Sequence, residues 1–182
     1  YLDFLQKMFE SMGGKLIEQT VTSFDAVFEQ TSMIINCAGL GARELCSDED
    51  LHAIRGQVVS IEKTEDPVLY FDTLGVIYVV PRIDDCILGG TAEEYDEDKE
   101  PRPETSVDIV ERCAAFVPEV RDAKVLGSFV GLRPARSAVR VERESLENDR
   151  VIIHNYGHGG AGLTLSWGCA QTVCSAVAKG YG

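Results

Sequence analysis

The sequence predicts an α/β protein in which antiparallel strands interrupt an alternating helix–strand pattern. Helices and strands alternate over residues 1–40, short turns separate strands over residues 56–90, and a strand followed by a long helix ends the chain. Of the 182 residues, 45% are hydrophobic and 26% are charged, which is enough apolar material for a core. We expect three parts, residues 1–48, 49–127 and 128–182, of which the first and last belong together.

The first part begins with a predicted helix over residues 1–12, which a Gly-Gly pair ends. Its apolar residues recur at helical spacing: Leu2, Leu5, Met8, Phe9 and Met12. A short strand is predicted over residues 15–21 and a brief helix over residues 23–29. A buried strand over residues 33–39 then runs into a glycine turn.

The middle part has the pattern of an antiparallel sheet. Strands are predicted over residues 56–62, 75–81 and 86–90, and the turn at residues 83–85 makes the last two a hairpin. Acidic residues are dense between residues 93 and 100, where we expect a solvated loop.

The rest of the chain returns to longer elements. A helix is predicted over residues 104–117, and Pro118 ends it. A final helix is predicted from about Leu163 to Lys179. Between the two helices we expect three strands, over residues 123–130, 139–143 and 151–155.

Charge and cysteine spacing exclude several classes of function. The 30 acidic and 17 basic residues give a net charge of −13, which argues against nucleic acid or an anionic membrane surface as partner. No apolar run is long enough to cross a membrane. The 6 cysteines form no CxxC pair and no zinc-ligand spacing, so we expect no metal site. We interpret them as small buried hydrophobic residues of a protein in a reducing, intracellular compartment.

A glycine-rich loop between a strand and a helix is the strongest local signal for a site. Four glycines lie between residues 157 and 162, so that backbone can approach a ligand closely. Unpaired N–H groups at the helix N-terminus favour an anion or a developing negative charge. The alternative is a glycine turn that serves packing alone.

Arg133 is a candidate carboxylate-binding residue. Pro134 restricts it to an extended conformation, and a guanidinium held at a fixed angle suits bidentate capture of a carboxylate. The alternative is a surface arginine paired with acidic neighbours. Tyr78 lies in a β-branched run, where a tyrosine usually belongs to the sheet, and His154 reads as a hydrogen-bonded structural histidine.

Taken together and in this order, six segments resemble the FAD-dependent D-amino-acid oxidase family. The segments are Asn36–Gly39, Arg55–Gln57, Tyr78–Pro81, Leu88–Thr91, Gly131–Arg136 and His154–Gly160. The resemblance implies the C-terminal part of a Rossmann-like FAD-binding domain, residues 1–48 and 128–182, and an antiparallel substrate-binding domain, residues 49–127. The N-terminal GxGxxG unit of such a domain is absent from residues 1–60.

The resemblance also implies an activity and residue roles. D-amino-acid oxidases convert a D-amino acid and dioxygen to the keto acid, ammonia and hydrogen peroxide. In this family pattern, Arg133 binds the substrate carboxylate, the Tyr78 hydroxyl adds a bond to it, and the Gly160 carbonyl accepts from the amine. The expected FAD contacts are Cys37, Ala38, Gly159, Gly160, Ala161, Gly162, Leu163 and Thr164.

Other features narrow this interpretation and leave alternatives open. No basic residue follows Gly89-Gly90-Thr91, so a neutral or basic D-amino acid is expected rather than D-aspartate. Without the GxGxxG unit, we expect the chain alone to bind FAD poorly and to need an N-terminal chain or fragment. A glycine- or sarcosine-oxidase-like enzyme, a D-aspartate oxidase, a non-catalytic fragment and an unrelated α/β binding module remain alternatives. A homodimer, and cytoplasm or peroxisome as the compartment, also stay open.

Overall fold

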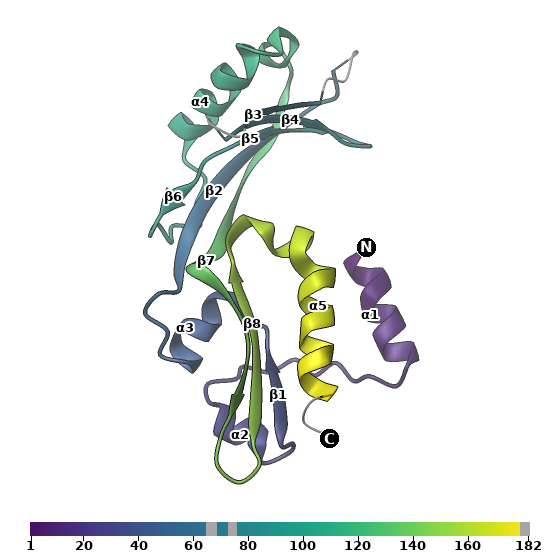
Figure 1. The fold of residues 1–182 in the computed structure, drawn as a ribbon. Coiled ribbons are helices and arrows are strands. Elements are labelled where there is room, and N and C mark those ends of the chain that lie inside the picture. The colour runs from purple at the N-terminus through teal and green to yellow at the C-terminus, as the bar shows by residue number, and fades with distance from the viewer. Residues whose placement is uncertain (65–68, 73–75, 179–182) are drawn as a thin grey trace.

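A computed structural model describes residues 1–64, 69–72 and 76–178, in which one curved sheet runs the length of the molecule (Figure 1). The strands are β1 Met33–Asn36, β2 His52–Ile61, β3 Tyr70–Asp72, β4 Ile77–Pro81, β5 Cys86–Gly89, β6 Glu93–Glu94, β7 Val125–Ser145 and β8 Val151–His158. The α-helices are α1 Leu2–Ser11, α2 Phe24–Phe28, α3 Ala42–Leu45, α4 Pro103–Ala114 and α5 Gly162–Ala178. Three 3₁₀ turns are η1 Gly39–Gly41, η2 Pro118–Arg121 and η3 Gly159–Ala161.

The sheet has a parallel end and an antiparallel end. Its strand order is β1-β8-β7-β2-β5-β4-β3, with β6 beside β2. β1 and β8 are parallel, with Asn36 opposite His154, whereas the other described pairs are antiparallel. The carboxyl ends of β1 and β8 therefore lie together, where ligands bind in many α/β sheets. The predicted α/β fold with an antiparallel middle is confirmed.

At the antiparallel end, α4 covers one face of the sheet and builds the main core (Figure 1). Side chains alternate between the faces of a strand, so every second residue faces α4. Val59 of β2, Leu88 of β5, and Ile109 and Cys113 of α4 are fully buried in this core. The residues between them face the other side of the sheet, away from α4.

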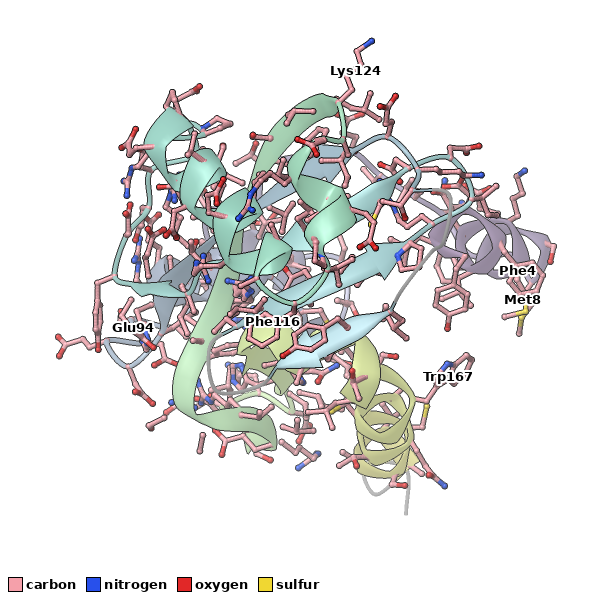
Figure 2. All side chains as sticks on the ribbon, turned by 90° about the horizontal axis from the view of Figure 1, so that it is seen from above. Phe4, Met8, Glu94, Phe116, Lys124 and Trp167 are labelled. Carbon is pink, nitrogen blue, oxygen red and sulfur yellow. The ribbon has the colours of Figure 1, made fainter. Side chains whose placement is uncertain are left out.

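At the parallel end, α5 packs beside β8, and α1 lies next to α5 (Figure 1). Ile153 and Val173 belong to a small core there, but α1 buries none of its residues. Phe4, Met8 and Trp167 are exposed and project from the same side of the molecule (Figure 2). The Trp167 indole Nε1 donates to the Tyr1 hydroxyl at 2.9 Å, which joins α5 to the start of α1. Within the described residues, no helix is long and apolar enough to cross a membrane.

Two of the strand predictions are wrong. Residues 15–21 form no strand, and Leu16 and Ile17 are largely exposed, because no neighbouring strand is there to pair with them. The strands predicted over residues 123–130 and 139–143 are one long strand, β7. Pro134 lies within β7, opposite Ala53 of β2, and the pairing of β7 with β8 is irregular between Ala135 and Arg140.

The acidic stretch is more ordered than the predicted solvated loop. Glu93 and Glu94 form β6, which pairs with β2. Arg102 also forms ion pairs with Asp96 and Asp98, at 2.8 and 3.1 Å. Ion pairs with arginines outside the acidic run order this segment. The run of acidic residues by itself does not indicate these pairs.

The remaining predictions mostly hold. The helices at residues 1–12, 23–29 and 104–117 and the β4–β5 hairpin are confirmed within one to three residues. β2 begins four residues before the predicted start at residue 56, and β8 extends three residues beyond the predicted end at residue 155. Gly75 and Lys179, at two predicted element ends, lie outside the described residues.

The interpretation of the cysteines as buried hydrophobic residues is only partly right. Cys86 and Cys113 are buried in the main core, whereas Cys37 and Cys174 are exposed. All six cysteines have free thiols. The division of the chain at residues 48 and 127 stays a prediction.

Candidate functional site

Arg133 and Tyr78 lie on the face of the sheet that α4 leaves uncovered. In the register of the sheet, Tyr78 is opposite Gly89, and Gly89 is opposite Val58. Gly56, two residues before Val58, is opposite Gly131, which lies two residues before Arg133. Because side chains alternate along a strand, Tyr78 and Arg133 point to the same side.

Two glycines make room for these side chains. A Cβ atom on Gly56 would overlap the Arg133 guanidinium, and one on Gly89 would overlap the Tyr78 ring. A Cβ atom on Gly90 would lie 2.9 Å from the Tyr78 hydroxyl. The Arg133 guanidinium therefore lies against the backbone of β2 at Gly56. The Tyr78 ring lies against the backbone of the adjacent strand β5 at Gly89, with its hydroxyl at Gly90.

The guanidinium of Arg133 lacks the acidic partner that most arginines of this chain have. Its Nη1 donates to the backbone carbonyl of Thr91 at 3.1 Å, and among the described residues no carboxylate forms an ion pair with it. Arg136, by contrast, pairs with Asp48, with Nε and Oδ2 3.0 Å apart. The alternative interpretation, a surface arginine paired with acidic neighbours, therefore describes Arg136 and not Arg133.

A hollow of about 370 Å³ lies over this face of the sheet. Its lining combines small, apolar and cationic residues: Gly56, Val58, Phe129, Val130, Gly131, Leu132 and Arg133. Phe71 stacks on Tyr78 at the neighbouring strands, with ring centroids 5.6 Å apart. Such a site can hold the carboxylate of a small molecule at Arg133 and an apolar group beside it.

The glycine-rich loop joins β8 to α5 beside Arg133. Gly157 and Gly159 have φ values of +83° and +55°, a region that glycine adopts readily. A Cβ atom on Gly160 would lie 3.6 Å from Cδ of Arg133, so the loop and the arginine are in contact distance. The loop continues through Ala161 and Gly162 into the 17-residue helix α5, whose first turn carries no acidic residue. Leu163 and Thr164, in that first turn, are exposed.

Cys37 and Ala38 lie at the carboxyl end of β1, beside the end of β8. The Ala38 amide donates to Oδ1 of Asn36 at 3.1 Å, which shapes the turn into η1. Asn155 of β8 approaches Cys37, with Nδ2 and Sγ 3.8 Å apart. The residues predicted to contact a cofactor thus come from two turns at the same edge of the sheet, and Cys37, Ala38 and Gly160 are exposed there.

A buried hydrogen-bond network supports both turns, and sequence reasoning missed most of it. Nδ1 of His154 lies 3.3 Å from Nδ2 of Asn36, and its Nε2 lies 2.9 Å from Oε2 of Glu144. The prediction that His154 is a hydrogen-bonded structural histidine is confirmed. Nearby, the Tyr156 hydroxyl donates to Asp48 at 2.6 Å, and burial together with this bond raises the pKa of Tyr156. Tyr156 and Asp48 are 108 residues apart in the sequence and His154 and Asn36 are 118 apart, so no local pattern indicates these two pairs.

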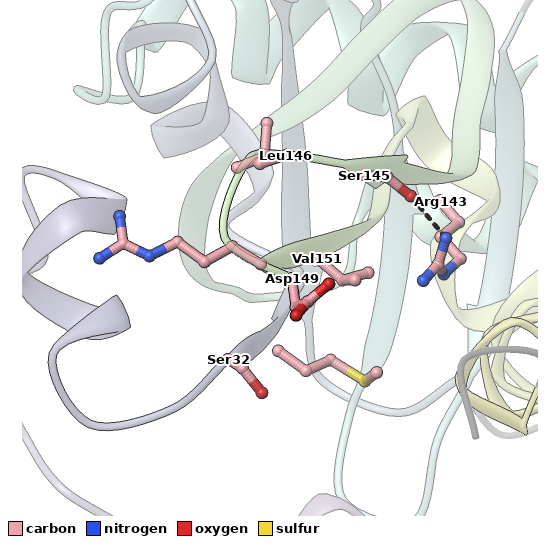
Figure 3. A pocket seen from close by; sticks show the side chains of 8 residues that line it. Ser32, Arg143, Ser145, Leu146, Asp149 and Val151 are labelled. Carbon is pink, nitrogen blue, oxygen red and sulfur yellow. Dashed lines mark hydrogen bonds between the residues drawn. The ribbon is translucent and has the colours of Figure 1, made fainter.

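A second hollow, of about 350 Å³, lies at the opposite end of β8 (Figure 3). Ser32, Ser145, Leu146, Asp149 and Val151 line it around the β7–β8 hairpin. Arg143, which also lines it, donates to the Ser145 hydroxyl at 2.6 Å. Because the glycine-rich loop follows the other end of β8, this hollow is separate from Arg133 and the predicted cofactor turns.

Comparisons with known proteins match this chain to FAD-dependent oxidoreductases and to proteins named D-amino-acid oxidase. Residues 1–176 match the family model described as FAD dependent oxidoreductase. The chain is 42% identical over 174 residues to a D-amino-acid oxidase of Rubrobacter xylanophilus, covering 94% of this chain and 53% of that protein. It is 43% identical over 178 residues to a D-amino-acid oxidase of Streptomyces coelicolor, covering 94% of this chain and 54% of that protein. The chain thus spans about half the length of these curated relatives.

The fold is also found among solved structures. The crystal structure of glycine oxidase from Geobacillus kaustophilus superposes with a TM-score of 0.70 at 19% sequence identity. The match covers 81% of this chain and 41% of that protein. At this identity the similarity establishes the fold alone.

Proposed function

The chain belongs to the FAD dependent oxidoreductase family, and on this premise we propose that it forms the substrate-binding and flavin-facing part of a D-amino-acid oxidase. The proposed reaction converts a D-amino acid and dioxygen to the keto acid, ammonia and hydrogen peroxide. Two relatives at 42% and 43% identity with the name D-amino-acid oxidase support this choice within the family.

The observation that carries the proposal is the position of Arg133. Its guanidinium lies over Gly56, next to Gly160, and has no acidic partner among the described residues. A half-buried guanidinium without an internal carboxylate suits a carboxylate that arrives with a ligand. We propose that Arg133 binds the substrate carboxylate in bidentate geometry.

Tyr78 and Gly160 complete the proposed substrate contacts. The Tyr78 hydroxyl lies against Gly90, on the same face as Arg133, and in our proposal it donates a further bond to the carboxylate. The Gly160 carbonyl accepts a hydrogen bond from the substrate amine. These contacts hold two substituents of the α-carbon, the carboxylate and the amine. In our proposal, the hollow beside Arg133 accepts the side chain as a third, which is what selection of one enantiomer requires.

The two turns at the edge of the sheet fit the flavin part of FAD. Glycines with positive φ let backbone N–H groups approach a planar ligand, and the N-terminus of α5 favours developing negative charge. The proposed contacts are Cys37, Ala38, Gly159, Gly160, Ala161, Gly162, Leu163 and Thr164. When bound, FAD supplies the acceptor for the substrate hydride and the group that dioxygen reoxidises. We propose that residues beyond those of this chain hold the remainder of the cofactor, since the relatives are about twice as long.

We propose a neutral or basic substrate rather than D-aspartate, and the hollow beside Arg133 supports a neutral side chain most directly. Among the described residues that line it, Arg133 alone is charged, and Val58, Phe129 and Leu132 are apolar. A second substrate carboxylate would lose water without gaining a cationic partner, at a cost of several kcal/mol.

Peroxide formation tests the proposal directly. The chain, together with its proposed N-terminal part and FAD, is assayed with D-alanine, D-lysine, D-aspartate and glycine. We expect the highest kcat/KM with D-alanine or D-lysine. The absence of peroxide with every D-amino acid, from a preparation that shows flavin absorbance, would contradict the proposed activity, and a preference for glycine would favour a glycine-oxidase-like enzyme.

A further inference from the structure

We propose that Glu93 is a positioning residue for Arg133 and acts on it through Thr91. This inference rests on the proposed role of Arg133 in carboxylate binding. It gives a role to part of the acidic segment, residues 93–100. The run of acidic residues by itself indicates only a solvated surface. The path consists of four residues, Arg55, Glu93, Thr91 and Arg133, that the structure connects by hydrogen bonds.

Thr91 is the residue that holds the Arg133 guanidinium. Its backbone carbonyl accepts from Nη1 of Arg133 at 3.1 Å. This bond occupies Nη1 and leaves the edge formed by Nε and Nη2, which is one of the two edges on which a guanidinium binds a carboxylate in bidentate geometry. Gly160 lies near the Nε end of the side chain, since a Cβ atom placed on it would be 3.6 Å from Cδ and 3.8 Å from Nε. The bond to Thr91 thus leaves free the edge that we assign to the substrate carboxylate.

Thr91 is itself fixed by its hydroxyl group. Oγ1 accepts from the backbone N–H of Gln57 at 2.9 Å and donates to Oε2 of Glu93 at 3.3 Å. A hydroxyl that donates to one group and accepts from another has a defined rotamer. Because the hydroxyl and the carbonyl belong to one residue, a loss of either hydroxyl bond loosens the carbonyl that holds Arg133.

Glu93 is anchored in turn by Arg55, whose side chain is fully buried. Nη1 of Arg55 donates to the same Oε2 of Glu93 at 2.6 Å. The other Arg55 donors are also engaged, with the Asp98 carbonyl at 2.9 Å, the Glu100 carbonyl at 2.8 Å and Oε1 of Gln57 at 2.9 Å. A buried guanidinium whose three nitrogens all donate cannot shift without leaving donors unpaired, so Oε2 of Glu93 has a fixed position.

The two arginines lie on opposite faces of the sheet. Arg55 and Gly56 are neighbours in β2, so Arg55 faces away from the side on which Arg133 covers Gly56. Thr91, just after β5, connects the two faces. The buried Arg55 therefore provides a rigid anchor, and the half-buried Arg133 is the residue that we propose binds the ligand. Such preorganisation improves binding because the ligand does not have to order the side chain.

Glu94 provides a matched control for Glu93. Both are glutamates of β6, and both pair with a base: Oε2 of Glu94 lies 2.6 Å from Nε2 of His52. Glu94 projects outward at the periphery (Figure 2) and, within the described part of the chain, makes no bond to Thr91. Glu93→Gln and Glu94→Gln therefore remove the same charge from adjacent positions, and only the first touches the path to Arg133.

The first measurement does not depend on any catalytic activity. Nitrogen-15 NMR of the arginine side chains, with Arg133→Lys as the assignment variant, reports how fast the Arg133 guanidinium protons exchange with water. We expect exchange to accelerate about threefold to tenfold in Glu93→Gln, because the bond to Thr91 opens more often, and to remain at the wild-type rate in Glu94→Gln. Equal exchange in the two variants would overturn the inference.

The second measurement separates this inference from the proposed function. In the FAD-loaded protein, we expect Glu93→Gln to raise KM for D-alanine about threefold to tenfold with kcat largely retained, and Glu94→Gln to change neither. If the wild-type protein does not oxidise D-alanine, the proposed function fails. The proton-exchange data still test whether Glu93 positions Arg133. If Glu93→Gln lowers kcat at unchanged KM, the positioning role is wrong.

Thr91 offers a second pair of variants in case Glu93→Gln does not fold. Thr91→Val removes both hydroxyl bonds at similar volume, and Thr91→Ser keeps them. The inference requires faster exchange of Arg133 in Thr91→Val and a return toward the wild-type rate in Thr91→Ser. The same rate in both would contradict it.

Discussion

The antiparallel end and the parallel end of the sheet differ in how completely they are covered. At the antiparallel end, Val59, Leu88 and Ile109 have no exposed surface, and α4 closes the core. At the parallel end, α1 buries no residue, and α5 buries only Val173. The proposed substrate contacts Arg133 and Tyr78 stand on the open face of the sheet toward the well-packed end, whereas the proposed cofactor turns belong to the sparsely packed end.

This difference indicates that packing within this chain stabilises the two ends of the sheet to different degrees. The antiparallel end contains its own core, and the Arg133 guanidinium donates to the Thr91 carbonyl just after β5. The parallel end presents apolar side chains such as Phe4 and Trp167 to solvent. We therefore expect the parallel end to contribute less to the stability of this chain than the antiparallel end.

The largest expected effect concerns Arg133, the proposed substrate contact on the open face of the sheet. Arg133→Ala, in the FAD-loaded protein, should lower kcat/KM for a D-amino acid well over tenfold, because it would remove the proposed charged bidentate contact, which is worth about 2–5 kcal/mol. Steady-state peroxide assays measure the change. A variant with wild-type turnover would show that Arg133 does not bind the substrate carboxylate.

The next expected effect measures the difference in packing. Ile109→Ala should lower the free energy of unfolding by about 2–4 kcal/mol, because it opens a cavity in the closed core. Met8→Ala on α1, whose side chain is 41% exposed, should change it by no more than about 0.5 kcal/mol. Urea unfolding of this chain provides both values. Equal losses would mean that α1 is packed as firmly as α4.

A smaller effect is expected for the second proposed carboxylate contact. Tyr78→Phe removes one hydroxyl and leaves Arg133 in place, so kcat/KM should fall by about threefold to tenfold, which corresponds to about 0.7–1.4 kcal/mol. The ring should keep its position against Gly89. A loss as large as that of Arg133→Ala would indicate that the hydroxyl has a role beyond this one bond.

The smallest effect concerns acid stability of the β4–β5 hairpin. The Arg82 guanidinium, followed by the Ser60 hydroxyl, lowers the pKa of Asp85 from 3.8 to about 2. A carboxyl group with a lowered folded-state pKa stabilises the fold above its unfolded value, so this contribution is present above pH 3.8 and is lost as the pH falls toward 2. Asp85→Asn should flatten the fall of the melting temperature in that range. An unchanged slope would show that the ion pair contributes nothing measurable.

Local sequence patterns predicted much of the secondary structure and the candidate residues. Periodicity predicted α1 and α4, and the turn at residues 83–85 predicted the hairpin, because these signals arise between residues close in the sequence. The extended conformation of Arg133 follows from Pro134, and the glycine-rich loop before α5 follows from its composition. The strand predicted at residues 15–21 failed because a strand also needs a partner, and partners are decided by the fold.

The sequence by itself determined the fold class, the helices and which residues could carry chemistry. Only the tertiary structure decided that Arg133, Gly160 and Tyr78 share one face, and that Arg136 has an acidic partner while Arg133 does not. It also showed that the acidic segment is bonded to the buried Arg55. The physical reason is that side-chain propensities act over a few residues, whereas strand register and ion pairing join groups 38 to 118 residues apart.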